Sequence, residues 1–267
     1  MRIALLVSLA ILSTACAVNP VTGRRQLMLV SEQQAISDSK EAYIAEMNQL
    51  GQNGKLSQDK AMIARVESIT SKLVAQAITF RPETTAWEWS VNVIKDDETV
   101  NAFCMAGGRM AIYSGLITRL DASDDEIAQV MGHEIAHALS NHTAEKMSVA
   151  LATSTGVALL GIAQRDNALA VSAGAMAAAV AVQLPNSRTA ESESDTIGIE
   201  LAARAGYDPR AAVSLWKKMA EVSGGGADWF STHPAPGKRQ DALAKLVPKM
   251  DPLYRDPAPR PSYELRH

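Results

Sequence analysis

A capped amphipathic segment, residues 123–138, constrains the fold more than any other part of this sequence. Ser123 is followed three residues later by Glu126, which is the pattern of a capping box at the start of a helix. The apolar side chains that follow recur at helical spacing and are Ile127, Val130, Met131, Ile135 and Ala138. The sequence therefore predicts a helix that buries one face and carries the stretch MGHEIAH, residues 131–137.

The polar residues of this stretch have the spacing of a hydrolytic metal site. His133 and His137 are four residues apart, so they share one helical face and can reach one ion. Zinc favours imidazole nitrogen and carboxylate oxygen in a tetrahedral arrangement, and it lowers the pKa of water that it binds. Glu134 lies about 100° further round the helix, where it can act as a general base on that water. The alternative is three polar residues on an ordinary helix.

A catalytic zinc site needs a third protein ligand. His142 lies five residues after His137, but the metzincin spacing requires a glycine and a histidine where the chain has Ser140 and Thr143. We therefore interpret His142 as a helix-end histidine near the negative end of the helix dipole.

A better candidate for the third ligand lies in SRTAESESD, residues 187–195. Glu191 and Asp195 are four residues apart and share a helical face, so Glu191 can bind zinc while Asp195 accepts an N–H from a ligand histidine. Spacing alone supports this weakly, because acidic pairs on helices are usually solvated. Glu193 lies on another face and is assigned no role.

The first 16 residues predict an exported chain. A short positive start precedes an apolar run, residues 3–12, that is too short to be a stable bilayer anchor. Two interpretations remain open, an ordinary cleavage site at residues 15–17 or a bacterial lipobox in LSTAC, although Leu12 stands four residues before Cys16 instead of three. We favour a lipoprotein-type signal peptide over residues 1–15, with Cys16 lipidated as a membrane anchor.

Three further observations bear on location and partners. Ala17 stands where an aspartate would favour inner-membrane retention, so the periplasmic side of the outer membrane is favoured. Cys104 is the only other cysteine, and we expect it to be a small buried thiol. The net charge of -3, with no basic stripe, argues against nucleic acid as a partner.

The order of predicted elements indicates an α+β fold, mostly helical with a small, mainly antiparallel sheet. Strands are predicted at 87–94 and twice within 101–117, around Gly107-Gly108. Outside the central segment, helices are predicted at 31–49, 57–78, 188–205, 209–222 and 236–247. The domain spans residues 31–247, after a lead-in at 16–30 and before a proline-rich tail at 248–267 that we expect to be extended or disordered. Residues 147–184 predict two helices and a turn, either a flap over the site or a membrane or partner surface.

The motifs together resemble the HtpX and CAAX-prenyl-protease superfamily of zinc metallopeptidases. HEIAH followed by ESESD matches that superfamily, and the glutamate of its E-x-x-x-D motif falls on Glu191. NAFCMAGG and STHPAPGKR match two more of its segments, and NPVTGRRQL resembles its short exported lipoprotein branch, typified by LoiP. The resemblance covers about residues 19–247 and implies a zincin-like, gluzincin fold that binds one Zn²⁺ per chain.

The resemblance also implies further site residues. His233 or Arg239 would stabilise the oxyanion, or His233 would bind zinc as a fourth ligand; the alternatives are a loop histidine and a salt-bridged arginine. The strand from Arg109 to Tyr113 would be an edge strand that pairs with an extended peptide. The residues expected to contact substrate are Asn101, Ala102, Phe103, Met110 and Ala111.

The function predicted from the sequence is a lipid-anchored zinc endopeptidase that hydrolyses misfolded or misassembled envelope proteins without a covalent intermediate. One alternative is an assembly lipoprotein that uses the same fold to bind nascent envelope proteins without cleaving them. A weaker alternative is a zinc hydrolase acting on a cell-wall amide. The expected partners are unfolded polypeptides and the membrane, and an oligomer is possible.

Overall fold

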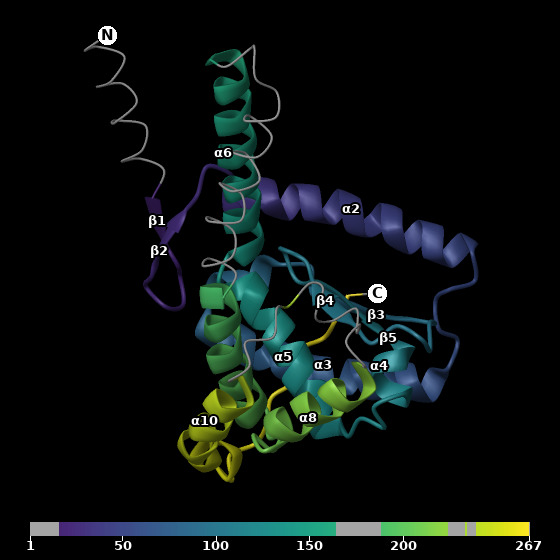
Figure 1. Ribbon diagram of the computed structural model, residues 1–267. Helices are drawn as coiled ribbons and strands as arrows, with labels where there is room; N and C mark the ends of the chain where they lie inside the picture. Colours follow the sequence, from purple (N-terminus) through teal and green to yellow (C-terminus); the bar gives the residue numbers. More distant parts are fainter. Residues whose placement is uncertain (1–15, 164–187, 224–232, 234–238, 267) are drawn as a thin grey trace.

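The computed structural model describes residues 16–163, 188–223, 233 and 239–266, and it confirms the predicted, mostly helical α+β class (Figure 1). The first elements in chain order are β1 (Cys16–Val18), β2 (Arg25–Leu27), α2 (Glu32–Gln52), α3 (Lys60–Phe80) and the 3-10 helix η1 (Pro82–Ala86). The next are β3 (Ser90–Ile94), β4 (Ala102–Cys104), β5 (Arg109–Tyr113), α4 (Ser114–Thr118), α5 (Asp124–Leu139) and α6 (His142–Ala163). The last are the helix at 188–204, α8 (Ala211–Ser223) and α10 (Arg239–Tyr254).

The helix α5 is the centre of the fold, and it begins as the sequence predicts. The Ser123 Oγ atom accepts from the Glu126 N–H at 3.2 Å, while a Glu126 carboxylate oxygen accepts from the Ser123 N–H at 3.0 Å. All five residues of the predicted apolar stripe are buried. α5 packs against α3, β4 and α8 (Figure 1). His133 is buried and His137 is half-buried.

The three-stranded sheet has the order β3-β5-β4, with β5 parallel to β3 and antiparallel to β4. Two strands connected around Gly107-Gly108 are confirmed. The prediction that Arg109–Tyr113 is an edge strand is wrong, because both sides of β5 are paired. Main-chain pairing of a substrate with Met110 or Ala111 is therefore excluded, and both side chains are fully buried.

The ladder between β4 and β5 shows which main-chain groups of β4 are not paired with β5. The Tyr113 N–H donates to the Asn101 carbonyl at 3.0 Å, and the Met105 N–H donates to the Arg109 carbonyl at 2.8 Å. Residues of an antiparallel strand alternate in the direction of their main-chain groups. The groups of Ala102 and Cys104 therefore point away from β5, at the edge of the sheet next to α5.

Two glycines allow α5 to cross the helix at 188–204 in backbone contact. A Cβ atom added at Gly132 would stand 2.8 Å from the Gly198 carbonyl oxygen, and one added at Gly198 would stand 2.8 Å from the His133 Cα atom. Contacts this short to backbone atoms cannot be relieved by rotating a side chain. The crossing therefore sets the separation between the helix that carries the histidine pair and the helix that carries Glu191.

The C-terminal segment differs from its prediction. α10 continues through Pro248 and Pro252 to Tyr254, so the expectation of an extended or disordered chain from residue 248 is wrong for these residues. The residues that follow pack on the domain: the Tyr263 N–H donates to the Ser71 carbonyl at 3.1 Å, and the Arg266 N–H donates to the Trp89 carbonyl at 2.8 Å. Tertiary packing thus overrides the helix-breaking tendency of proline here.

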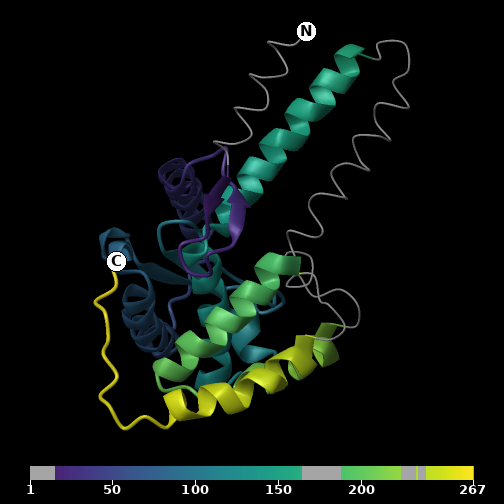
Figure 2. The ribbon, with the colours of Figure 1, turned by 90° about the vertical axis from the view of Figure 1, so that its left-hand side faces the viewer.

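The helix α6 extends away from the rest of the fold (Figure 2). It accounts for the first part of the segment predicted as two helices, whereas residues 164–184 of that segment lie outside the described residues. The predicted signal peptide, residues 1–15, also lies outside them. Within the part of the chain that the structure describes, no helix is both long and apolar enough to cross a bilayer.

The glycine crossing can be tested by adding one methyl group. We expect Gly198→Ala to lower the free energy of unfolding by about 1–3 kcal/mol, because it overpacks a backbone contact. Gly51→Ala, also in a helix, is the control: its added Cβ would lie 3.6 Å from the nearest atom, Leu56 Cδ1, and should cost nothing. Thermal unfolding of both variants checks this, and equal melting temperatures would contradict the role of the crossing.

Candidate metal centre

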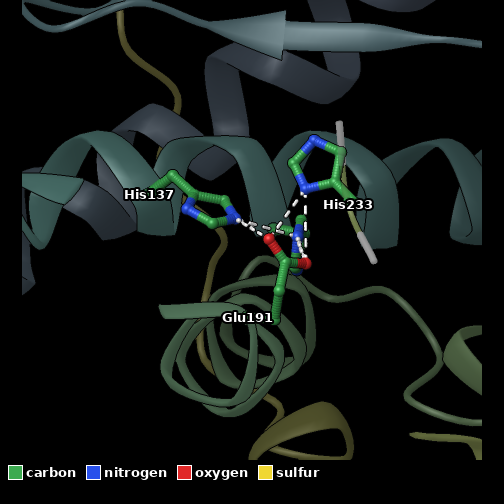
Figure 3. Close-up of side chains that lie close together, drawn as sticks. His137, Glu191 and His233 are labelled. Carbon is green, nitrogen blue, oxygen red and sulfur yellow. Dashed lines mark hydrogen bonds and ion pairs between the residues drawn. The ribbon is translucent and has the colours of Figure 1, made fainter. Parts of the chain in front are cut away.

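Four side chains from three parts of the chain converge on one point. His133 and His137 come from α5, Glu191 from the helix at 188–204, and His233 from the segment before α10 (Figure 3). One ligand atom of each lies within 4.8 Å of the others. Glu191 Oε2 is 3.4 Å from the Nε2 atom of His133, while Glu191 Oε1 is 3.4 Å from the Nε2 atom of His137 and 3.0 Å from His233 Nδ1.

The donor set of this cluster fits zinc. Three imidazole nitrogens and one carboxylate oxygen are ligands that Zn²⁺ takes in four-coordinate sites. Burial lowers the pKa of His137 well below its ordinary value, which keeps the ring in the neutral form that binds metal. Burial raises the pKa of Glu191, but hydrogen bonds from His133, His137 and His233 outweigh this and hold the carboxyl ionised. The structure thus brings together His133, His137 and Glu191 as predicted, with His233 beside them.

His133 is supported by a carboxylate and an arginine. Its Nδ1 atom lies 3.2 Å from an Asp195 oxygen, which is the predicted position of Asp195. Arg239 holds that carboxylate through two bonds of 2.6 Å, and its guanidinium also lies 2.9 Å from Glu191 and 4.1 Å from the centre of the Trp216 ring. Arg239 is therefore a buried, salt-bridged residue that holds the ligand helix, and its predicted oxyanion role stays a prediction.

The ionisation of His133 follows from these contacts. Burial lowers the pKa of His133, and so does the positive charge of Arg239. Hydrogen bonds to Asp195 and Glu191 outweigh both and raise the pKa to about 9. A metal ion that binds here must therefore displace a proton from His133 at neutral pH.

Glu134 lies beside the cluster with an unsatisfied oxygen. The side chain is buried, and its Oε1 atom accepts no hydrogen bond from any described residue. His233 Nε2 lies 3.4 Å from that oxygen, without hydrogen-bond geometry. Burial raises the pKa of Glu134. A desolvated carboxylate oxygen with no partner is placed to take a hydrogen bond from a water or substrate.

Of the predicted substrate residues, Asn101, Ala102 and Phe103 lie along the edge of the sheet next to α5, whereas Met110 and Ala111 lie on the central strand β5. Asn101 uses its side-chain oxygen to accept from the Ala102 N–H at 2.9 Å, directly before β4. The Phe103 ring packs against the ring of Tyr43 from α2. Cys104 is a buried free thiol, as predicted, and burial raises its pKa well above the ordinary value.

The sequence did not predict that His142 contacts the metal cluster or that Glu193 contacts His142. His142 Nδ1 lies 2.9 Å from His137 Nδ1, and His142 Nε2 lies 2.9 Å from a Glu193 oxygen. His142 begins α6 and does not simply end α5, because Asn141 reverses the chain with a φ of 56°. Asparagine tolerates this conformation better than most residues, so Ser140-Asn141 was the available sequence signal.

Comparison with known proteins shows the family of the chain. Residues 61–247 match the model of peptidase family M48. The chain is 33% identical over 251 residues to "Metalloendopeptidase OMA1, mitochondrial" of Bos taurus, covering 88% of this chain and 47% of that protein. It is 30% identical over 226 residues to "Putative beta-barrel assembly-enhancing protease" of Vibrio cholerae, covering 78% of this chain and 45% of that protein.

The chain therefore belongs to peptidase family M48, and the predicted metallopeptidase is confirmed at the level of this family. The chain spans about half the length of these two relatives. The HtpX and CAAX-prenyl-protease resemblance and its lipoprotein branch stay predictions within that family.

The metal centre predicts that zinc stabilises the folded chain. A ligand that binds only the folded state adds about 2.7 kcal/mol at a concentration one hundred times its dissociation constant. We expect zinc to raise the melting temperature of the wild type, and Glu191→Gln to abolish most of that rise. The affinity should weaken as the pH falls below about 9, because zinc competes with the proton on His133. A zinc response in Glu191→Gln equal to that of the wild type would exclude Glu191 as a ligand.

Proposed function

We propose that this protein is an exported, lipid-anchored zinc endopeptidase that hydrolyses misfolded or misassembled envelope proteins. The observation that carries the activity is the Glu134 oxygen that no described residue bonds, beside the cluster of His133, His137, Glu191 and His233. Family membership and the relatives named metalloendopeptidases support it.

His133, His137 and Glu191 would hold the zinc, and His233 would complete the set when substrate is absent. When bound, zinc supplies a Lewis acid that polarises a peptide carbonyl and lowers the pKa of water. Glu134 accepts the proton of the attacking water and then donates it to the leaving amine, which suits its raised pKa. Asp195 keeps the Nδ1 proton of His133 in place, so that its Nε2 atom faces the ligand cluster.

The substrate would bind along the outer edge of β4. The Ala102 carbonyl and the main-chain groups of Cys104 point away from β5, so an extended peptide can add there as a further strand. Such pairing reads the backbone and not the sequence, which favours unfolded chains as substrates. Asn101 would lie at the start of this edge, and Phe103 would support the strand by packing on Tyr43.

The N-terminus and one relative support a location in the bacterial envelope. Cys16 follows the predicted signal peptide, residues 1–15, and begins the first described strand, so a lipid on it would anchor the domain directly. The Vibrio cholerae relative is named for β-barrel assembly, which supports envelope proteins as the substrate class. We place the protein on the periplasmic side of the outer membrane.

The base can be tested with an isosteric change. Glu134→Gln keeps the shape of the side chain but cannot accept a proton, so we expect cleavage of unfolded casein to fall by at least about 100-fold while zinc binding persists. Glu41→Gln, on the exposed face of α2, is the matched control and should be fully active. Full activity of Glu134→Gln would exclude the mechanism. Rescue of a deletion strain by that variant would favour the non-cleaving assembly protein.

A further inference from the structure

The N-terminal hairpin packs on the corner between α5 and α6, directly behind the ligand His137. β1 and β2 pair antiparallel, and Asn19 closes the turn between them by accepting from the N–H groups of Val21 and Thr22 (Figure 1). The side chains of Asn19 and Gln26 both donate to the carbonyl of Ser140, the residue that caps α5. The hairpin therefore fixes the end of the ligand helix.

Arg24 connects this hairpin to both neighbouring helices. Its Nη1 and Nη2 atoms donate to the two carboxylate oxygens of Glu145 on α6, at 2.8 and 2.7 Å. Its Nε atom donates to Glu193 Oε1 on the helix at 188–204, at 3.0 Å. Thr22 donates to the same oxygen at 2.6 Å. The arginine thus joins α6 to the helix that carries Glu191.

The contacts continue from Glu193 to the metal ligand. Glu193 Oε2 lies 2.9 Å from His142 Nε2, and His142 Nδ1 lies 2.9 Å from His137 Nδ1. His137 Nε2 faces Glu191, so it is the atom that binds metal. The Nδ1 atom of His137 then carries the proton and donates to His142 Nδ1, and His142 uses its Nε2 proton to donate to Glu193. This arrangement of protons gives each of the hydrogen bonds between His137, His142 and Glu193 one donor and one acceptor.

Each of the two ligand histidines is therefore linked, directly or through another side chain, to a carboxylate paired with an arginine. His133 contacts Asp195, which is paired with Arg239. His137 contacts His142, which reaches Glu193 and its partner Arg24. A metal-binding histidine is oriented by the group that accepts its other N–H, and such partners affect metal affinity by about 10–100-fold.

We propose that Arg24 is a positioning residue of the metal centre, acting through Glu193 and His142 on the ligand His137. The hairpin that holds it lies before residue 61, where the match to the family model begins. The proposal rests on the proposed function only in requiring that the cluster binds zinc. It predicts that a change in the hairpin alters the metal site without touching any ligand.

The test measures metal binding to the full chain, separately from peptidase activity. The zinc dissociation constant is obtained by competition with a chromophoric chelator, and the absorption spectrum of the cobalt-substituted protein reports the ligand geometry. We expect Arg24→Gln and Glu193→Gln each to weaken zinc binding by about tenfold or more and to shift the cobalt spectrum. The double variant should bind no more weakly than the weaker single variant, because both act through one chain of contacts.

The matched controls lie next to the tested residues. Arg25→Gln removes the exposed neighbouring arginine, and Glu200→Gln removes a surface ion pair with Arg204 on the same helix as Glu193. Both should keep the zinc affinity and cobalt spectrum of the wild type. If Arg24→Gln does not fold, Thr22→Val provides the test, because it removes one exposed donor to Glu193. Zinc binding at least threefold weaker in Thr22→Val than in the wild type supports the proposal.

The result that overturns the proposal is a variant at Arg24 whose zinc affinity and cobalt spectrum equal those of the wild type. An equal loss in Arg25→Gln would also overturn it, since that would be a general effect of the hairpin. A wild type that binds zinc but does not cleave casein would exclude the proposed function and leave this inference supported by its own measurements. A wild type that binds no zinc would overturn both.

Discussion

The backbone contact between Gly132 and Gly198 is the constraint on which the site depends. The histidine pair on α5 and the carboxylate on the helix at 188–204 meet beside a point where the two backbones are in direct contact. The absence of a Cβ atom at both positions permits that approach one residue before His133. The remaining interactions adjust the direction of side chains whose separation is already set by this crossing.

The polar residues around the crossing form a buried system in which each charge has a partner. Arg239 lies between the Asp195 and Glu191 carboxylates, and Arg24 joins Glu145 to Glu193. Burying single charges at these positions would be costly, and pairing each with hydrogen-bonded partners offsets that cost. Among the cluster residues and Glu134, the buried oxygen left without a hydrogen bond within the described chain is on Glu134, where the proposed chemistry needs it.

Sequence reasoning succeeded where the information is local to one helix. The capping box of α5, its buried stripe and the shared face of His133 and His137 all follow from periodicity. It failed where separate elements meet. Alternation along a strand does not reveal its neighbours, so β5 was taken for an edge, and helical spacing does not reveal that Glu193 faces His142. α10 continued through two prolines because packing outweighs local propensity.

The hairpin at the N-terminus also has a mechanical consequence. Cys16 pairs with Leu27 in the ladder of β1 and β2, so the chain between Cys16 and Arg24 is folded back on itself and has no slack. A lipid on Cys16 would attach the catalytic domain to the membrane through a short, structured connection and not through a flexible linker. Such a connection would limit the enzyme to polypeptide substrates close to the membrane surface and would keep its metal centre at a constant orientation toward them.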